Sequence, residues 1–211
     1  MTIAVVDYGA GNLRSVEKAL LRAGGRDVVV TSDPQLVASA DRVVLPGDGA
    51  FPDCRAALSH ANGLGEALAE AVLRRGRPFL GICIGMQLLA TEGEEYEPTP
   101  GLGWIPGRVV RIHPGDARLK VPHMGWNTLE RHRAHRLVEG LDLGPDGLHA
   151  YFLHAYHLVP DEADDVVASA SYGGPVTALV ARGNVAGVQF HPEKSQRLGL
   201  AMLANFVEWR P

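Results

Sequence analysis

The sequence is poor in cysteine, in basic charge and in long apolar runs, and each shortage excludes a class of protein. Two cysteines among 211 residues, Cys54 and Cys83, are too few for the disulfide framework of a small secreted domain. A formal net charge of −4 gives no basic footprint for nucleic acid or an anionic membrane. No apolar run approaches the roughly 20 residues of a membrane-spanning helix. The first residues lack a basic segment and meet an acid at Asp7, so we expect no signal peptide and a cytoplasmic protein.

Glycine is the residue in excess. The chain holds 25 glycines in 211 residues, above the usual share of about 7%. Glycine gathers where backbone bends sharply or approaches a ligand closely. The hydrophobic share of 46% and the charged share of 21% are those of an ordinary globular protein. The length fits one domain over residues 1–211.

The hydrophobic pattern predicts an α/β fold. Short apolar strands are expected over 3–6, 28–30, 43–45 and 79–82, with helices expected after each, over 12–23, from 33, over 64–72 and over 85–90. Strands joined by helical crossovers indicate a doubly wound, mostly parallel central sheet. The second half favours a β-hairpin extension, with β-rich runs over 109–112, 151–153, 166–170, 176–180 and 186–190, then a last helix around 198–206. We interpret the acidic stretch 92–100 as a surface loop.

Cys83 has the surroundings of a nucleophile. The segment Gly81-Ile82-Cys83-Ile84-Gly85 carries an apolar strand into a helix, the nucleophile-elbow pattern with cysteine in place of serine. Flanking glycines remove side chains that would collide in so tight a turn. The helix N-terminus favours thiolate, and the Ile84 amide would face an oxyanion. The alternative is a packing cysteine, which is our interpretation of Cys54.

His191 is the best candidate for the base among nine histidines. It follows the apolar run Gly187–Phe190, and Pro192 should end that strand, which places His191 at the edge where open α/β sheets bind ligands. Glu193, two residues on in extended backbone, would orient the imidazole. The alternative is a rim histidine beside a solvated glutamate. His132 and His135 lie in a basic stretch and are expected to be solvated.

Two glycine-rich turns follow other strands. After Pro46, Gly47-Asp48-Gly49 could turn the amides of Asp48 and Gly49 toward a substrate carbonyl, although a plain type II turn gives the same pattern. The segment Gly9–Arg14 is half of a dinucleotide fingerprint, but its third glycine is replaced and no acid ends the next strand. We therefore predict no dinucleotide site.

Taken together, these motifs resemble the class I, triad-type glutamine amidotransferases, which have a flavodoxin-like fold. More narrowly, the chain is similar to the glutaminase subunits of imidazole glycerol phosphate synthase. The matching segments are Asp7–Leu13, Pro46–Gly49, Gly81–Gln87, Val121–Asn127, Tyr151–Tyr156 and Gln189–Ser195. They span nearly the whole chain. Ile84 and Asp48 depart from the usual pattern.

The resemblance implies a role for each matching residue. Cys83, His191 and Glu193 would be the triad that hydrolyses glutamine through a γ-glutamyl thioester. Further roles are implied for the oxyanion-hole amides (Ile84, Asp48, Gly49), for glutamine binding (Gln87, Gly47, His154, Ala155, Tyr156) and for partner contact (His123, Trp126, Asn127).

The resemblance also implies a partner. The ammonia would pass to a (β/α)8-barrel synthase subunit, in a heterodimer, which forms imidazole glycerol phosphate and AICAR from a ribulosyl substrate. No cofactor and no metal are implied. Two alternatives stay open: a glutaminase that serves another acceptor synthase, and a cysteine hydrolase of similar fold.

Overall fold

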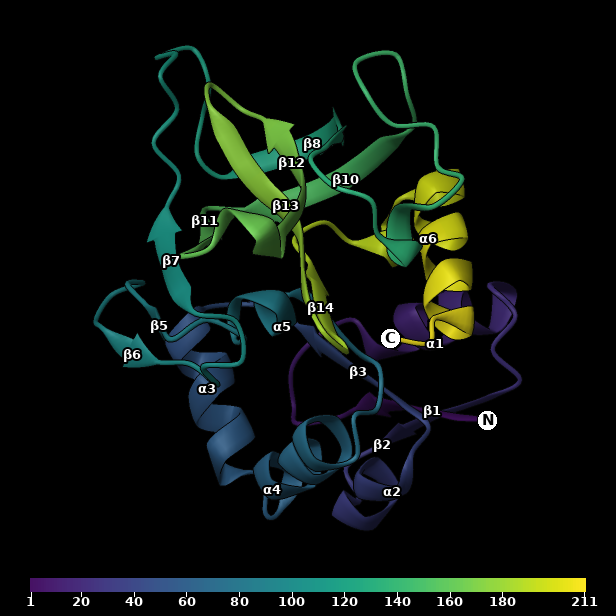
Figure 1. Cartoon of the computed structure of the whole chain (residues 1–211). Coiled ribbons are helices and arrows are strands. Elements are labelled where there is room, and N and C mark those ends of the chain that lie inside the picture. Colours follow the sequence, from purple (N-terminus) through teal and green to yellow (C-terminus); the bar gives the residue numbers. More distant parts are fainter.

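The computed structural model describes residues 1–211 around an eight-stranded sheet of order β2-β1-β3-β4-β14-β13-β12-β9 (Figure 1). Five neighbouring strands are parallel: β2 (Asp27–Thr31), β1 (Thr2–Val6), β3 (Arg42–Gly47), β4 (Phe79–Cys83) and β14 (Val185–Val188). The antiparallel strands β13 (Pro175–Arg182), β12 (Val166–Ser171) and β9 (Glu130–Arg131) extend it. The doubly wound, mostly parallel sheet is confirmed, with the flavodoxin-like order at its start.

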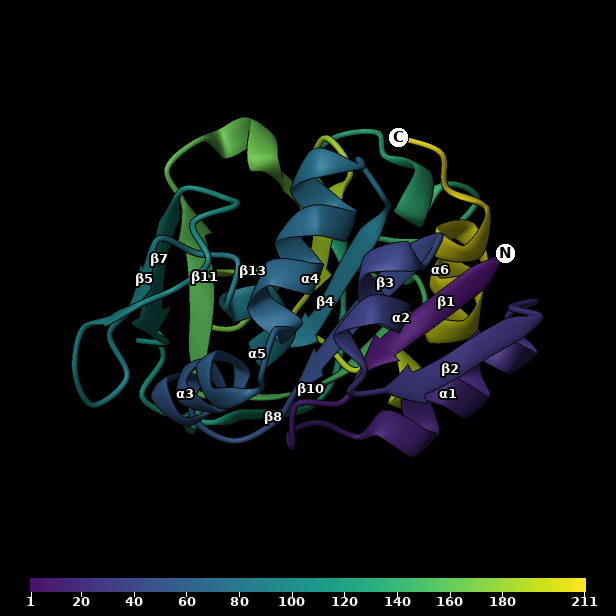
Figure 2. The ribbon, with the colours of Figure 1, turned by 90° about the horizontal axis from the view of Figure 1, so that it is seen from below.

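Helices cover both faces of this sheet because its central strands are apolar on both sides. All residues of β3, β4 and β14 are buried, within a hydrophobic cluster of 55 residues. One face carries α1 (Leu13–Arg22) and α6 (Gln196–Glu208). The other carries α2 (Pro34–Ser39), α3 (Phe51–His60), α4 (Leu64–Ala69) and the π-helical turn η1 (Glu70–Arg74) (Figures 1 and 2). None of these helices combines the length and apolarity needed to cross a bilayer.

Local sequence accounts for where several helices start. Asp33 accepts a 2.9 Å hydrogen bond from the Gln35 amide, and Pro34 occupies the first turn of α2, as predicted. The apolar stripe of α1 is buried through Val16, Ala19 and Leu20. Helix α3 was not predicted, although Pro52 in its first turn and the buried Phe51 and Cys54 are consistent with it.

Two smaller sheets form the remaining layer. β8 (His123–Thr128) pairs with β10 (His149–His154), and a four-stranded sheet has the order β11 (Tyr156–Pro160), β7 (Gly107–Arg111), β5 (Glu92–Gly93) and β6 (Thr99–Pro100). Three short 3₁₀ turns, η2 (Arg136–Val138), η3 (Ala163–Asp165) and η4 (Pro192–Lys194), complete the chain. The predicted β-rich second half is confirmed.

Three boundaries differ from prediction. The acidic segment expected to be a loop is a small hairpin, because its ends pair as β5 and β6. The helix expected over 85–90 is only α5 (Ile84–Gln87), since the carbonyls of Leu88 and Leu89 accept amides from Leu102 and Trp104 and cannot continue the helix. The strand expected to stop before Pro46 continues through Gly47, paired with β4.

Candidate active site

Cys83 lies at the turn where β4 enters α5. Its backbone has φ 55° and ψ −112°, a conformation that is strained for a residue with a side chain, and it is 3% exposed. This is the strand-to-helix turn predicted for a nucleophile. Ile84 provides the first amide of α5, where a helix has no acceptor of its own. The turn therefore presents a thiol beside an uncommitted N–H group.

Close backbone contacts explain the glycines around Cys83. A Cβ atom on Gly85 would lie 1.8 Å from the Leu45 carbonyl oxygen, and one on Gly81 would lie 2.3 Å from the Gly85 carbonyl oxygen. A Cβ on Gly47 would lie 2.7 Å from the Gly85 amide nitrogen. The strands β3 and β4 thus press directly on the turn, and the steric reason predicted for the glycines is confirmed.

His191 and Glu193 form a buried pair. The His191 Nδ1 and Glu193 Oε1 atoms are 3.0 Å apart, with side chains 5% and 1% exposed. Burial alone would lower the pKa of His191, but hydrogen bonds to Cys83 and Glu193 outweigh it and raise the pKa to about 10. The imidazole is therefore held in its charged form next to the thiol.

The backbone around this pair differs from the extended segment expected. β14 ends at Val188, not at residue 190, and Pro192–Lys194 form the 3₁₀ turn η4. The turn is braced by Ser195, whose hydroxyl donates to the His191 carbonyl at 2.6 Å and accepts the Tyr151 amide at 2.9 Å. A 3₁₀ turn, rather than strand pleating, brings Glu193 to the imidazole.

Gln189 is a site residue that sequence reasoning missed. It is fully buried, and its Nε2 atom lies 3.7 Å from the Cys83 sulfur as a donor. Its Oε1 atom accepts from Gln87 Nε2 at 3.0 Å, so the direction of the amide is fixed. A donor aimed at sulfur stabilises thiolate more than thiol. The feature of the sequence that could have identified Gln189 is its position two residues before His191.

The Gly47–Gly49 loop lies beside the thiol, but one of its amides is occupied. The Gly49 N–H group donates to the Asp48 carboxylate at 3.0 Å. The Asp48 carbonyl accepts the Cys54 thiol at 3.2 Å, which gives this buried cysteine a role in holding the loop beyond the packing predicted for it. In this conformation the Gly49 amide is not offered to a substrate.

Cys83 and the Asp48–Gly49 turn border a small cavity of about 220 Å³, whose lining does not include His191, Glu193 or Gln189. Its lining joins the two turns to β10 and β11, through Asp48, Gly49, Cys83, Ile84, Gln87, Glu95, Pro122, Leu153, His154, Ala155 and Tyr156. Gln87 donates to the Tyr156 carbonyl at 2.9 Å, while its own Oε1 atom is buried without a partner. A buried acceptor without a donor favours a ligand that carries N–H groups.

Glu95 is the second residue that was missed, because it falls in the stretch interpreted as a loop. Its Oε2 atom accepts the Phe51 amide, the first N–H of α3, at 2.8 Å. The β5–β6 hairpin thereby brings a carboxylate into the cavity and ties it to the helix that follows the Gly47–Gly49 loop. This carboxylate can hold a cationic group of a ligand.

His154 and His123 form a buried chain of rings behind the cavity. His154 Nδ1 lies 2.8 Å from the Tyr156 carbonyl, His123 Nδ1 lies 3.1 Å from His154 Nε2, and Asn127 Nδ2 lies 3.3 Å from His123 Nε2. Burial lowers the pKa of His123 to about 4 and that of His154 to about 3, so both rings are neutral. At 2% exposure, stacked on Phe152, His123 cannot be the partner contact predicted for it.

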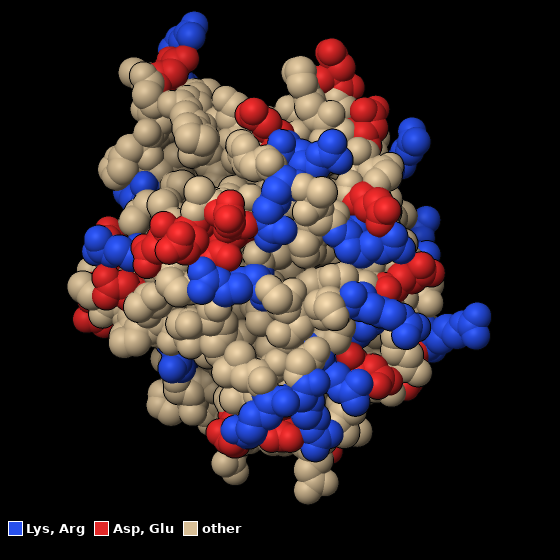
Figure 3. Space-filling model, viewed as in Figure 1, with Lys and Arg blue, Asp and Glu red and all other residues tan.

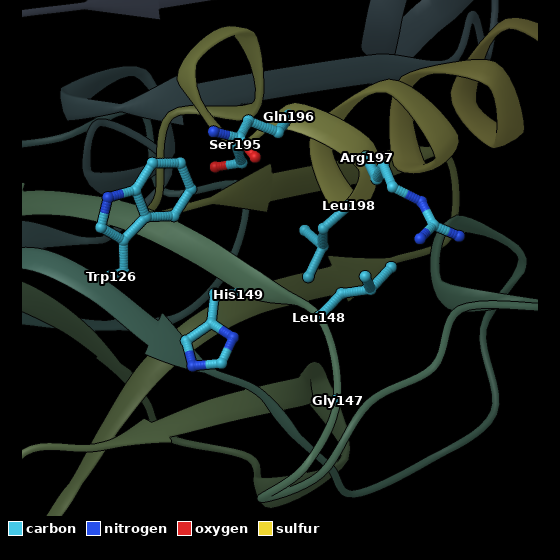
Figure 4. A pocket seen from close by; sticks show the side chains of 8 residues that line it. All are labelled: Trp126, Gly147, Leu148, His149, Ser195, Gln196, Arg197 and Leu198. Atoms are coloured by element: carbon cyan, nitrogen blue, oxygen red, sulfur yellow. The ribbon is translucent and has the colours of Figure 1, made fainter.

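Trp126 is, in contrast, a surface residue. It is 49% exposed, with its ring edge-on to the Tyr151 ring, and the Lys194 ammonium group lies 5.8 Å from the centre of the Tyr151 ring. It borders a hollow of about 380 Å³ between β8, β10 and the start of α6, to which His149 and Arg197 also contribute (Figure 4). His132 and His135 were both expected to be solvated. His132 is exposed, but His135 is half-buried, and burial and the charge of Arg133 lower the pKa of His135 to about 4.

Comparisons with known proteins agree with this geometry. The family model described as glutamine amidotransferase class-I matches residues 4–209. The proteins named imidazole glycerol phosphate synthase subunit HisH from Caulobacter vibrioides and Rhizobium meliloti are 59% and 55% identical, over 100% of this chain and 99% and 100% of theirs. The structure of PurLQS from Thermotoga maritima has the same fold, with a TM-score of 0.72 and 20% identity over 98% of this chain and 97% of that one. The chain belongs to the glutamine amidotransferase class-I family.

Proposed function

We propose that this chain is a glutaminase that supplies ammonia to a synthase subunit, in an imidazole glycerol phosphate synthase. The observation that carries the proposal is the strained, buried Cys83 beside a His191 whose pKa is raised to about 10. An imidazolium next to a thiol indicates an ion pair in which the sulfur is the nucleophile. The HisH relatives extend the proposal from glutamine hydrolysis to the synthase.

The reaction would begin when the thiolate attacks the side-chain amide carbon of glutamine. His191 gives its proton to the leaving nitrogen, so that ammonia departs and a γ-glutamyl thioester remains on Cys83. Water, deprotonated by His191, then cleaves the thioester to glutamate and restores the thiolate beside the charged imidazole. Glu193 holds the imidazole in place and stabilises its charged form throughout.

Binding groups are available at both ends of the substrate. The Ile84 amide, together with the amides of Asp48 and Gly49 once they turn inward, would hold the oxyanion. The unpartnered Oε1 atom of Gln87 fits the amide nitrogen that becomes ammonia, and Glu95 fits the α-ammonium group. Among the other residues implied for glutamine binding, His154, Ala155 and Tyr156 line the cavity and supply its shape, whereas Gly47 does not border it.

A partner subunit would receive the ammonia, and we propose a (β/α)8 barrel docked on the face that carries Trp126. A half-exposed tryptophan beside Tyr151 and Lys194 supports docking, because aromatic side chains are enriched at interfaces. Asn127, the residue after Trp126, is held in place by hydrogen bonds to His123 and to the Ser171 carbonyl. The cytoplasm is the expected compartment.

The test is Cys83→Ala in the purified pair with the barrel subunit and the ribulosyl substrate. Glutamine-dependent product formation should disappear, and formation with added ammonium salt should remain at the level of the unmodified pair. Loss of both activities, or retention of both, would refute the role of Cys83. Trapping glutamine on the unmodified protein as a thioester, detected by mass spectrometry, separates this function from that of a cysteine hydrolase with another substrate.

A further inference from the structure

A second hollow lies at the opposite edge of the central sheet from Cys83. It has a volume of about 520 Å³ and is lined by Met1, Asp41, Arg42, Arg75, Gly76, Arg77, Pro78, Trp209, Arg210 and Pro211. Four of these residues are arginines and one is an acid, in a chain whose net charge is −4. We call these four residues the arginine cluster. Over the region where Figure 1 places α4 and α2, Figure 3 shows Lys and Arg side chains gathered, with Asp and Glu side chains beside them.

Arg42 is the buried member of the arginine cluster. It is 6% exposed, and no carboxylate lies within 4 Å of its guanidinium. Its Nε and Nη2 atoms donate to the carbonyls of Val207 and Trp209 at 2.8 and 2.7 Å, which uses two of its five donors. Burial, followed by repulsion from Arg210, lowers the pKa of Arg42, and attraction from Asp41 offsets only part of this effect. A buried cation without a carboxylate in direct contact is a costly arrangement.

The other arginines add unused donors. Arg77 Nε is buried without any hydrogen-bond partner, and its Nη1 atom lies 3.5 Å from Asp41. The Asp41 carboxylate also accepts the Thr2 amide at 2.9 Å and lies 3.9 Å from the Met1 amino group, so its single charge offsets only part of the arginine cluster. Arg75 pairs with Glu70, outside the hollow, and Arg210 forms no ion pair. The hollow therefore holds excess positive charge and unsatisfied N–H groups together.

We propose that the arginine cluster binds a small multivalent oxyanion, the phosphate or pyrophosphate group of a metabolite or the free anion. Guanidinium groups bind phosphate oxygens through paired N–H donors, and one tetrahedral anion can accept from several arginines at once. A ligand with a single carboxylate would leave most of the positive charge of the arginine cluster uncompensated. An extended nucleic acid is disfavoured because the chain as a whole carries a net charge of −4 and has no extended basic footprint.

The arginine cluster is separate from the proposed glutaminase site. Arg42 begins β3 and Gly47 ends it, so five strand steps of about 3.3 Å, roughly 16 Å, lie between the hollow and the loop beside Cys83. A ligand at the arginine cluster cannot contact glutamine. Its binding can be measured without the partner and without turnover, so failure here would leave the proposed glutaminase function untouched.

A purely structural role for Arg42, holding the end of α6 to the sheet, is compatible with the contacts to Val207 and Trp209. Such a structural role requires no ligand, and it does not explain why Arg77 and Arg210 also line the hollow. The discriminating variants are therefore Arg77→Gln and Arg210→Gln, which leave those two contacts in place. Arg118→Gln is the matched control, because Arg118 is exposed and pairs only with Asp116, outside the hollow.

The experiment is isothermal titration of the full chain with sodium pyrophosphate, ADP and adenosine at constant ionic strength. Pyrophosphate should bind with a stoichiometry of one, and adenosine should not bind. Arg77→Gln should weaken binding by about 10- to 100-fold, the range for a lost hydrogen bond to a charged group. Circular dichroism of each variant establishes that the fold is intact.

The remaining outcomes decide the proposal. Binding of ADP as tight as pyrophosphate assigns a nucleotide as the source of the anion, and binding of pyrophosphate alone assigns the free anion. The proposal is overturned if neither pyrophosphate nor ADP binds saturably, or if Arg77→Gln and Arg118→Gln change the affinity equally.

Discussion

The amide of Gly49 donates a 3.0 Å hydrogen bond to the carboxylate of Asp48, the residue before it in the chain. The carboxylate thus occupies a donor that glutamine hydrolysis would use for the oxyanion. An anion next to an oxyanion also opposes the charge that develops there. Asp48 therefore acts as a restraint on the proposed site, built from the one side chain of this loop that departs from the usual pattern.

Removing that carboxylate should activate the isolated chain. Asp48→Ala leaves the Gly49 amide free, and we expect basal glutamine hydrolysis without partner to rise about 3- to 10-fold, the range for one ordinary hydrogen bond. Asp48→Asn keeps an acceptor oxygen but removes the charge, so it should raise the rate less than Asp48→Ala does. A coupled glutamate assay measures all three proteins. Equal rates for the two variants would show that the hydrogen bond does not restrain the loop.

Gln189 should matter for the reactivity of the thiol. Gln189→Met keeps the volume of the side chain and removes the donor 3.7 Å from the Cys83 sulfur. Alkylation of Cys83 by iodoacetamide at pH 7 should slow by about 10-fold, because a hydrogen bond to a charged group is lost. The matched control is Gln35→Met on the exposed surface of α2. An unchanged alkylation rate would make Gln189 a packing residue.

The pair His191–Glu193 predicts a measurable titration. Because hydrogen bonds to Cys83 and Glu193 raise the pKa of His191 to about 10, the ring should stay charged at pH 8. Glu193→Gln should lower this pKa and reduce kcat by at least about 10²-fold, the lower range for positioned proton transfer. A pH titration followed by NMR of the imidazole carbons measures the change in the pKa of His191. Glu208→Gln, at the exposed last residue of α6, should change neither the pKa of His191 nor kcat.

The neutral histidine chain predicts instability in acid. The unfolded chain protonates His123 and His154 near pH 6.5, whereas burial lowers their pKa in the fold to about 4 and about 3. The unfolded state therefore binds more protons between those values, and the free energy of unfolding should fall as the pH drops below about 6.5.

A variant separates the contribution of one ring. His123→Phe keeps the stack on Phe152 and Tyr172 but cannot take up a proton. At pH 7 it should cost about 1–3 kcal/mol, because His154 loses a hydrogen bond. The further loss between pH 6.5 and 4 should be smaller than in the unmodified chain, as measured by urea midpoints. An identical pH profile would assign the acid loss to other groups.

Replacing a glycine of the nucleophile turn by alanine should destabilise the protein far more than the same change at an open glycine elsewhere. Gly85→Ala places a Cβ atom 1.8 Å from the Leu45 carbonyl, and we expect a cost above about 3 kcal/mol because the neighbour is backbone. Gly65→Ala, in α4, meets nothing within 4 Å and should be neutral or stabilising by up to about 1 kcal/mol. Thermal unfolding of both proteins checks this. Similar melting temperatures would mean that the turn can move apart.

Much of this arrangement was predictable from local sequence. The thiol turn is specified within five residues, from Gly81 to Gly85, by a strand pattern and two small residues. His191 was predicted from the apolar run before it and the proline after it. Both predictions rest on short-range backbone chemistry, which a single sequence displays directly.

Other features depend on contacts between distant segments. Glu95 reaches the cavity only because β5 and β6 pair, and the burial of His123 depends on Phe152 and Tyr172 closing over its ring. The bond between Gly49 and Asp48 depends on which of two loop orientations the surroundings favour. Neither periodicity nor motif spacing carries this information, since each depends on tertiary packing.

The contact between Gly85 and Leu45 makes Cys83 a reporter of chain assembly. The thiol turn is pressed into shape by β3, a strand about 40 residues earlier in the sequence, so no fragment that lacks β3 can present the sulfur in this conformation. During refolding, Cys83 should acquire its distinctive reactivity only when β3 and β4 have joined. A pulse of thiol reagent would then time the closure of the central sheet, with Cys83 itself as the reporter and no label attached to the chain beforehand.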